Sequence, residues 1–69
     1  MSDIAIQIHL LDEPEGWVWD KLRAMIEEGQ ASSLGARTYE FHTYGDACVF
    51  QAELDHHGIK YEATSVDND

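Results

Sequence analysis

Residues 38–65 read TYEFHTYGDACVFQAELDHHGIKYEATS, and the choice between strand and helix in this stretch decides the fold. One interpretation divides the stretch into three antiparallel strands, at residues 38–44, 47–54 and 59–65. Gly45 and Asp46 then form a two-residue turn of the Gly-X kind, and residues 55–58 form the next turn.

Pairing through these two turns gives the predicted sheet a single apolar face. Its members are Tyr39, Phe41, Thr43, Cys48, Phe50, Ala52, Leu54, Ile59, Tyr61, Ala63 and Ser65. A slip of one residue at either turn would move the apolar side chains of a strand to the other face. Because both turns preserve the same face independently, the pattern favours three strands.

The alternative makes the middle of this stretch a helix that Asp46 caps and that ends at Gly58. The local sequence QAEL at residues 51–54 favours a helix. On a helical wheel, however, Phe50 and Leu54 fall apart from the other apolar side chains of the segment, so no clean apolar stripe results. We therefore favour the strands and keep the helix as the alternative.

The N-terminal half predicts one strand and one helix. Residues 3–11 alternate in polarity, which is typical of a strand, with one face formed by Ile4, Ile6, Ile8 and Leu10. Asp12 and Pro14 predict the start of a helix that runs to Glu28, with Gly29 as its C-terminal stop. One side of this helix is apolar and consists of Val18, Trp19, Leu22, Met25 and Ile26.

These elements predict a single acidic α+β domain over residues 1–69. The expected order is β-α-β-β-β, an antiparallel sheet with one helix packed on one face, and residues 30–36 form a loop. If residues 46–58 are helical instead, the order becomes β-α-β-α-β.

Charge is the strongest functional signal, because 14 acidic residues face 4 basic ones and the formal net charge is −10. Such a chain repels nucleic acids and anionic membranes, and attracts basic surfaces over roughly a Debye length. Direct nucleic-acid binding is disfavoured, since it requires Lys and Arg to neutralise phosphates. No apolar run approaches the ~18 residues of a membrane span, and the start lacks a secretory signal. We expect a cytoplasmic protein.

The sequence contains no motif for catalysis, for a cofactor or for a metal, and we expect none of the three. The candidate metal ligands are Cys48 and four histidines. A metal-dependent module built on His42, His56 and His57 is the least favoured option, because the last two are adjacent and point in different directions.

Eight side chains are candidates for binding a partner. Those on the predicted helix are Glu13, Trp17, Asp20, Glu27 and Glu28. Those on the predicted open face of the sheet are Glu40, Glu53 and Glu62. A tryptophan among carboxylates is typical of an apolar anchor within a charged rim, although Trp17 can also fold back against Leu11.

In its size, its charge balance and the stripe Glu13-Asp20-Glu27 beside Trp17, the chain resembles small acidic inhibitors encoded by phages and mobile elements. That class includes anti-CRISPR proteins and other DNA mimics. The resemblance implies a non-enzymatic monomer or homodimer in the host cytoplasm. It would bind a basic nucleic-acid-binding protein, for example a CRISPR effector complex, and block recognition of target DNA or of the PAM. The alternative is a small regulatory or adaptor domain whose charge serves solubility, and the two differ in salt dependence and in competition by DNA.

Overall fold

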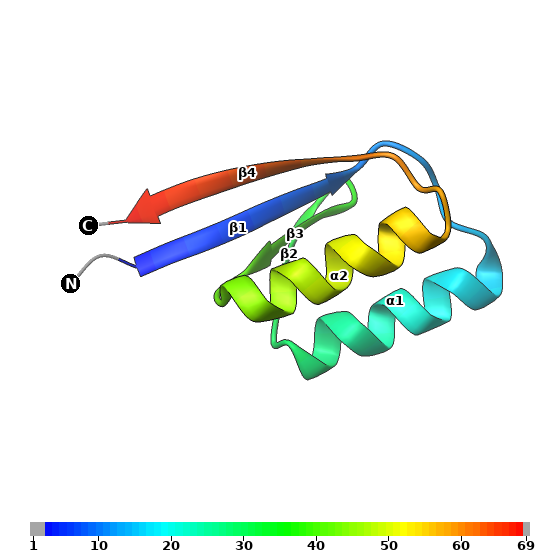
Figure 1. Ribbon diagram of the computed structural model, residues 1–69, viewed down its shortest axis with the longest axis horizontal. Helices are drawn as coiled ribbons and strands as arrows, with labels where there is room; N and C mark the ends of the chain where they lie inside the picture. Colours follow the sequence, from blue (N-terminus) through cyan, green and yellow to red (C-terminus); the bar gives the residue numbers. More distant parts are fainter. Residues whose placement is uncertain (1–2, 69) are drawn as a thin grey trace.

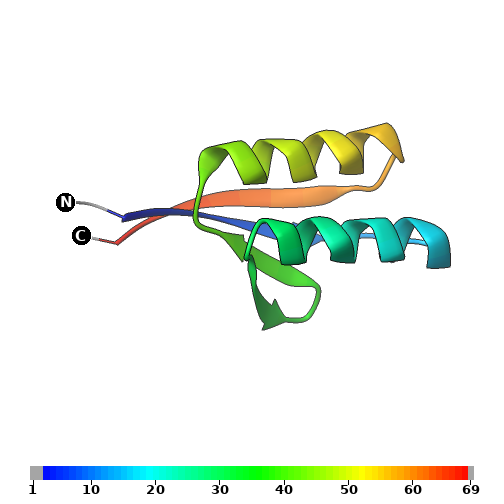
Figure 2. The same cartoon turned by 90° about the horizontal axis from the view of Figure 1, so that it is seen from below.

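Four strands form one antiparallel sheet in the computed structural model, which describes residues 3–68. The elements in chain order are β1 (Asp3–Leu10), α1 (Gly16–Glu28), β2 (Ser32–Gly35), β3 (Thr38–Phe41), α2 (Tyr44–His56) and β4 (Tyr61–Asn68). The strands lie in the order β2-β3-β1-β4, which is the ferredoxin-like, split β-α-β topology. Both helices cover the same face of the sheet (Figure 1). Figure 2 shows α1 on the side of the β2–β3 hairpin and α2 on the side of β4.

The core lies between the helices and the sheet. In β1 the predicted alternation is confirmed for Ile6, Ile8 and Leu10, which are buried beneath the helices, whereas Gln7 and His9 are half-buried on the open face. In the register of the sheet, Ile8 lies opposite Tyr39 of the neighbouring strand β3. The other buried members of the core are Val18, Leu22, Ile26, Phe41, Ala47, Phe50, Leu54 and Ile59.

Helix α1 ends where the sequence predicts but begins later. Its N-cap is Glu15, and Gly29 is its C-cap. Asp12 does not cap the helix, because its carboxylate accepts a hydrogen bond from the backbone N–H of Lys60 at 3.1 Å. That bond ties the β1–α1 loop to the start of β4, and the helical turns begin only at Gly16.

The prediction of a strand at residues 47–54 is wrong, because this segment lies within α2. Thr43 caps the helix: its side-chain oxygen accepts from the backbone N–H of Asp46 at 3.3 Å, and its hydroxyl donates to the Asp46 carboxylate at 2.7 Å. Asp46 therefore occupies the third helical position of a capping-box-like arrangement, and Gly45 and Asp46 form no hairpin turn. Gly58 follows the helix in the left-handed conformation, with φ of 69°.

The order β-α-β-β-β is therefore wrong, and the alternative β-α-β-α-β lacks one strand. That strand is β2, which lies within the predicted loop at residues 30–36 and pairs with β3 through an irregular register. The coarser prediction of a small α+β protein with an antiparallel sheet is confirmed. Within residues 3–68, neither helix is both long enough and apolar enough to cross a bilayer.

Candidate binding surface of the helical layer

Most carboxylates of the chain lie on one layer of the molecule. We call α1, α2 and the loop at residues 11–15 the helical layer. It carries nine carboxylates, on Asp12, Glu13, Glu15, Asp20, Glu27, Glu28, Asp46, Glu53 and Asp55. Glu53 is half-buried and the other eight residues are exposed. Two basic residues, Lys21 and Arg23, belong to the same layer, so it is strongly negative.

Both basic side chains of the helical layer already contact a carboxylate. Arg23 Nη2 lies 3.2 Å from Asp20 Oδ1, one turn away on α1, and its guanidinium also lies over the Trp19 ring at 5.7 Å. Because Arg23 and Asp20 are both exposed, water screens this ion pair and it contributes little to stability. Two bases cannot balance the nine carboxylates of the layer. Lys21 contacts Glu53, so neither base lies in an ion pair with Glu27 or Glu28.

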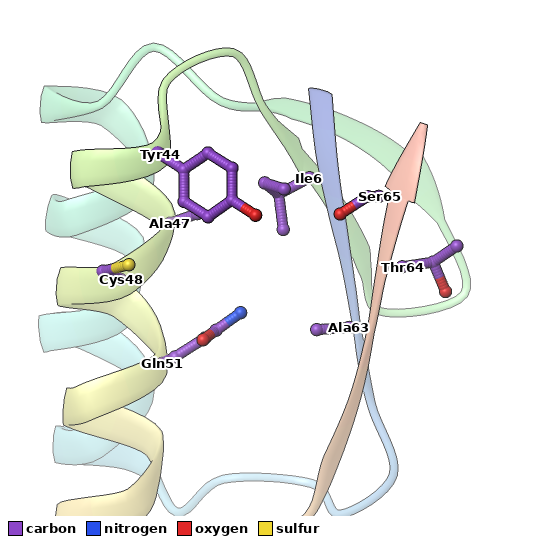
Figure 3. A pocket seen from close by; sticks show the side chains of 8 residues that line it. All are labelled: Ile6, Tyr44, Ala47, Cys48, Gln51, Ala63, Thr64 and Ser65. Atoms are coloured by element: carbon purple, nitrogen blue, oxygen red, sulfur yellow. The ribbon is translucent and has the colours of Figure 1, made fainter. Parts of the chain in front are cut away.

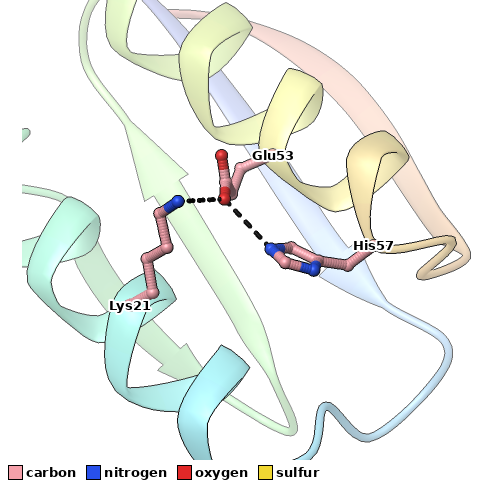
Figure 4. Close-up of polar contacts among 3 residues, drawn as sticks. All are labelled: Lys21, Glu53 and His57. Carbon is pink, nitrogen blue, oxygen red and sulfur yellow. Dashed lines mark hydrogen bonds and ion pairs between the residues drawn. The ribbon is translucent and has the colours of Figure 1, made fainter.

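Glu53 joins the two helices through a three-residue polar cluster (Figure 4). Its Oε1 accepts from Lys21 Nζ at 2.8 Å and lies 3.0 Å from His57 Nε2. The hydrogen bond from Lys21, and then that from His57, lower the pKa of the Glu53 carboxyl below its ordinary value of 4.5. The cluster thus bridges α1 and α2 and keeps Glu53 ionised.

The predicted position of Glu53 on the open face of the sheet is therefore wrong. Alternation along a strand would have placed it beside Glu40 and Glu62. Because residues 47–54 are helical, Glu53 turns toward α1 instead, where it contacts Lys21.

Trp17 is 66% exposed near the start of α1. Its indole meets the His57 ring edge-on, with centroids 5.3 Å apart and an interplanar angle of 81°. A surface depression of about 310 Å³ lies beside His57 and is lined by Glu13, Pro14, Glu15, Val18, His57 and Ile59. An apolar ring and several carboxylates therefore meet at this end of the helical layer.

The open face of the sheet is polar rather than strongly acidic. Glu40 of β3 is half-buried and accepts a hydrogen bond from Gln7 Nε2 at 3.0 Å. Glu62 of β4 is exposed and lies opposite His9 in the register. These two acids flank β1 from opposite sides, and the His9 ring lies 2.8 Å from the Thr38 hydroxyl.

Of the predicted candidates, Glu13, Trp17, Asp20, Glu27 and Glu28 are exposed on α1 and the loop before it, and Glu53 belongs to the same layer through α2. It leaves Glu40 and Glu62 on the other face of the sheet. Sequence reasoning missed Asp46 and Asp55 because it placed them in turns between strands. The spacing of Thr43 and Asp46 is the signal that could have identified α2 and both acids.

Two further findings concern potential metal ligands and similar proteins. Within residues 3–68, no three His, Cys, Asp or Glu side chains converge as ligands for a metal ion. No family model matches the chain, and no curated protein or solved structure matches it either.

Proposed function

We propose that the protein docks its helical layer onto a basic, nucleic-acid-binding surface of another protein and competes there with DNA. The observation that supports this function is the concentration of nine carboxylates on one layer that carries only Lys21 and Arg23 as bases. The two packed helices hold six of these carboxylates and the loop at residues 11–15 holds the other three, on one layer, as a duplex holds its phosphates on its surface.

The energetics of such docking follow those of nucleic acids. A groove lined by Lys and Arg binds DNA largely through phosphates, and much of the affinity comes from released counterions. Carboxylates at fixed positions gain from the same release and from the same long-range steering. On α1, Asp20 and Glu27 are seven residues apart, which corresponds to roughly 10 Å along the helix.

Trp17 supplies the apolar part of the contact. An exposed aromatic ring can bury its surface against the partner while the carboxylates around it form the charged rim. The protein is in this proposal a non-enzymatic inhibitor of the anti-CRISPR type, and the DNA-binding surface of a CRISPR effector complex is one recipient of suitable chemistry.

Charge reversal on the helical layer tests the proposal. The test variant carries Asp20→Lys and Glu27→Lys, two substitutions at exposed positions of α1. The matched control carries Glu40→Lys and Glu62→Lys, which change the net charge equally but on the open face of the sheet. Immobilised wild-type protein and both variants are used to capture proteins from host lysate, and the bound fraction is eluted with duplex DNA or with salt.

The expected result is that the wild type and the control retain nucleic-acid-binding proteins that duplex DNA releases. The helical-layer variant loses them. Affinity should fall steeply between about 50 and 200 mM salt, as it does for a polyanion. Undiminished capture by the helical-layer variant, at an unchanged thermal midpoint, would refute the proposal.

A second candidate function is a protein-interaction adaptor that uses apolar contacts. Tyr44 and Val49 on α2 favour this function, because their side chains are 63% and 60% exposed and contribute nothing to binding a basic groove. This function predicts binding that persists in high salt and that DNA does not displace.

A further inference from the structure

Helices α1 and α2 meet along a line that we call the helix seam. It is formed by three pairs of side chains, which are, in order along α1, Trp17–His57, Lys21–Glu53 and Met25–Val49. The residue numbers rise along α1 as they fall along α2, so the two helices are antiparallel. The middle pair is the ion pair of Figure 4, and the last pair lines a depression of about 100 Å³.

The two ends of the helix seam are apolar and accessible. Trp17 is 66% exposed at one end and Val49 is 60% exposed at the other, beside the half-buried Met25. Between them, Lys21 and Glu53 neutralise each other. Trp17 and Met25 are eight residues apart, which corresponds to roughly 12 Å along α1. The seam thus offers two apolar contact points that are about two helical turns apart.

The α1 side of the helix seam is acidic. Asp20 and Glu28 each lie three residues after a member of the seam, Trp17 and Met25 respectively, so they are its neighbours on the surface of α1. Both carboxylates are exposed, and Glu28 also lines the depression beside Met25 together with Asp46. A cationic group that approaches the seam from this side meets several carboxylates.

The α2 side of the helix seam is small and uncharged. On this helix the neighbours of Val49 are Gly45, four residues before it, and the exposed Ala52, three residues after it. Tyr44 belongs to a different side of α2. It lines a groove of about 230 Å³ between α2 and the strands, and Figure 3 shows its ring reaching toward them. Tyr44 is therefore an exposed apolar residue of α2 that lies off the seam.

We propose that the helix seam receives a helix of the partner, with apolar side chains on one side and Lys or Arg on the adjacent side. The inference rests on the proposed docking to a basic protein and names the element that docks. Charge complementarity selects it, because its bases face the acids of α1 while its apolar side lies on Val49 and Ala52. Apolar anchors about seven residues apart on this helix reach Trp17 and Met25. Val49, which contributes nothing to binding a groove of bases alone, is used by such a helix.

Two synthetic peptides of equal composition test the shape of the occupant. Both consist of Leu, Ala and Lys. In the amphipathic peptide Leu recurs at helical spacing, so that a helix has one apolar side, whereas in the shuffled peptide Leu is scattered. Fluorescence anisotropy of the labelled peptides measures both affinities at about 150 mM salt. The wild type should bind the amphipathic peptide about tenfold more tightly, because apolar anchors add to an equal charge. Equal affinities overturn the helix as the occupant.

Two substitutions on α2 test the place of docking. Val49→Gln and Tyr44→Gln each remove an exposed apolar side chain and leave the charge unchanged, but only the first lies on the helix seam. Val49→Gln should lower the affinity for the amphipathic peptide about tenfold, while Tyr44→Gln should not change it. Neither should alter binding of the shuffled peptide, and circular dichroism checks that both variants fold. Equal losses in the two variants overturn the seam as the place of docking.

Charge reversal separates this inference from the proposed function. The variant with Asp20→Lys and Glu27→Lys should lose both peptides. If it does, but the wild type binds both peptides equally, the basic partner stands and only the helix is overturned. A preference for the amphipathic peptide that survives charge reversal contradicts the basic partner, and with it the basic side of the docking helix.

Capture from host lysate extends the comparison to the native partner. Val49→Gln should lose the DNA-displaceable proteins that the wild type and Tyr44→Gln retain. Undiminished capture by Val49→Gln overturns the seam as the docking site, whereas capture that only the charge-reversed variant loses supports the proposed function without the helix.

Discussion

The two helices have the same length but differ in the polarity of the side that faces solvent. Helix α1 buries Val18, Leu22 and Ile26 and presents acids on its other side. Helix α2 buries Ala47, Phe50 and Leu54, yet its exposed side carries apolar residues such as Val49. The comparison shows that periodicity identifies a helix only where the far side is polar. A helix that is apolar on both sides is recognised by its cap and by the surface that it covers.

The largest effect is expected when a charge is placed on the buried side of α2, and the same charge on its exposed side is the control. Ala47 is buried against the sheet, whereas Ala52 is exposed. Ala47→Glu should lower the free energy of unfolding by more than about 3 kcal/mol, because it overpacks the core and buries an unpaired carboxylate. Ala52→Glu should change it by less than about 0.5 kcal/mol. Urea denaturation followed by circular dichroism measures both.

The opposite ranking would restore the three-strand interpretation, in which Ala52 faces the core. A variant Ala47→Glu that fails to fold is still informative, because Ala52→Glu must then fold normally.

Several parts of the fold were predictable from local signals. The alternation of β1 and the C-terminal end of α1 at Gly29 match the structure, because each has a strong signal of its own. Strand β2 was not predictable, since SSLG is exposed throughout and owes its pairing to β3. The prediction for residues 47–54 was wrong because their alternation fits a strand. The same residues also fit a helix, since Phe50 and Leu54 are four residues apart and are both buried in α2.

Removing the cap of α2 should have the next largest effect. Thr43→Ala leaves the backbone N–H of Asp46 without its side-chain acceptor and removes the hydroxyl that donates to the Asp46 carboxylate. We expect a loss of about 1 kcal/mol in the free energy of unfolding, measured by urea denaturation. Thr43→Ser keeps the oxygen and should lose less. Equal loss in both variants would contradict the cap.

In helix α1 a cap can be added rather than removed, because its N-cap residue Glu15 makes no side-chain capping bond. Its φ of −72° and ψ of 162° are the extended values that a capping residue needs. Glu15→Asp keeps the charge and shortens the side chain to the length that can cap. The free energy of unfolding should rise by about 0.5 kcal/mol, which a higher thermal midpoint would show. An unchanged or lower midpoint would show that the loop before α1 prevents capping.

Acid pH should reveal the cluster that joins the two helices. Since the pKa of Glu53 is lowered on folding, its stabilising contribution is present above the ordinary value of 4.5 and is lost as the pH falls through the folded pKa. Glu53→Gln should therefore make stability less sensitive to pH below about 4.5. Thermal midpoints measured from pH 7 to about pH 3 test this, with the exposed Glu27→Gln as the control. An identical acid sensitivity of Glu53→Gln and wild type would contradict the cluster.

The candidate surface was predictable in part, for the same reason as the fold. Carboxylates on α1 follow from a clear helical pattern, and Trp17 is exposed among them. The contributions of Asp46 and Asp55 depend on α2, whose one local signal is the cap formed by Thr43 and Asp46, and the position of Glu53 depends on its contact with Lys21, which is distant in sequence.

The register that pairs Asp3 with Asn68 brings the outer ends of β1 and β4 side by side, beyond the helices (Figure 1). Such a domain can be inserted as a cassette into a surface loop of another protein through two short linkers. The same geometry allows circular permutation: a linker can join the neighbouring ends, and new termini can open at the tight turn between β2 and β3 without removing β1 from the centre of the sheet.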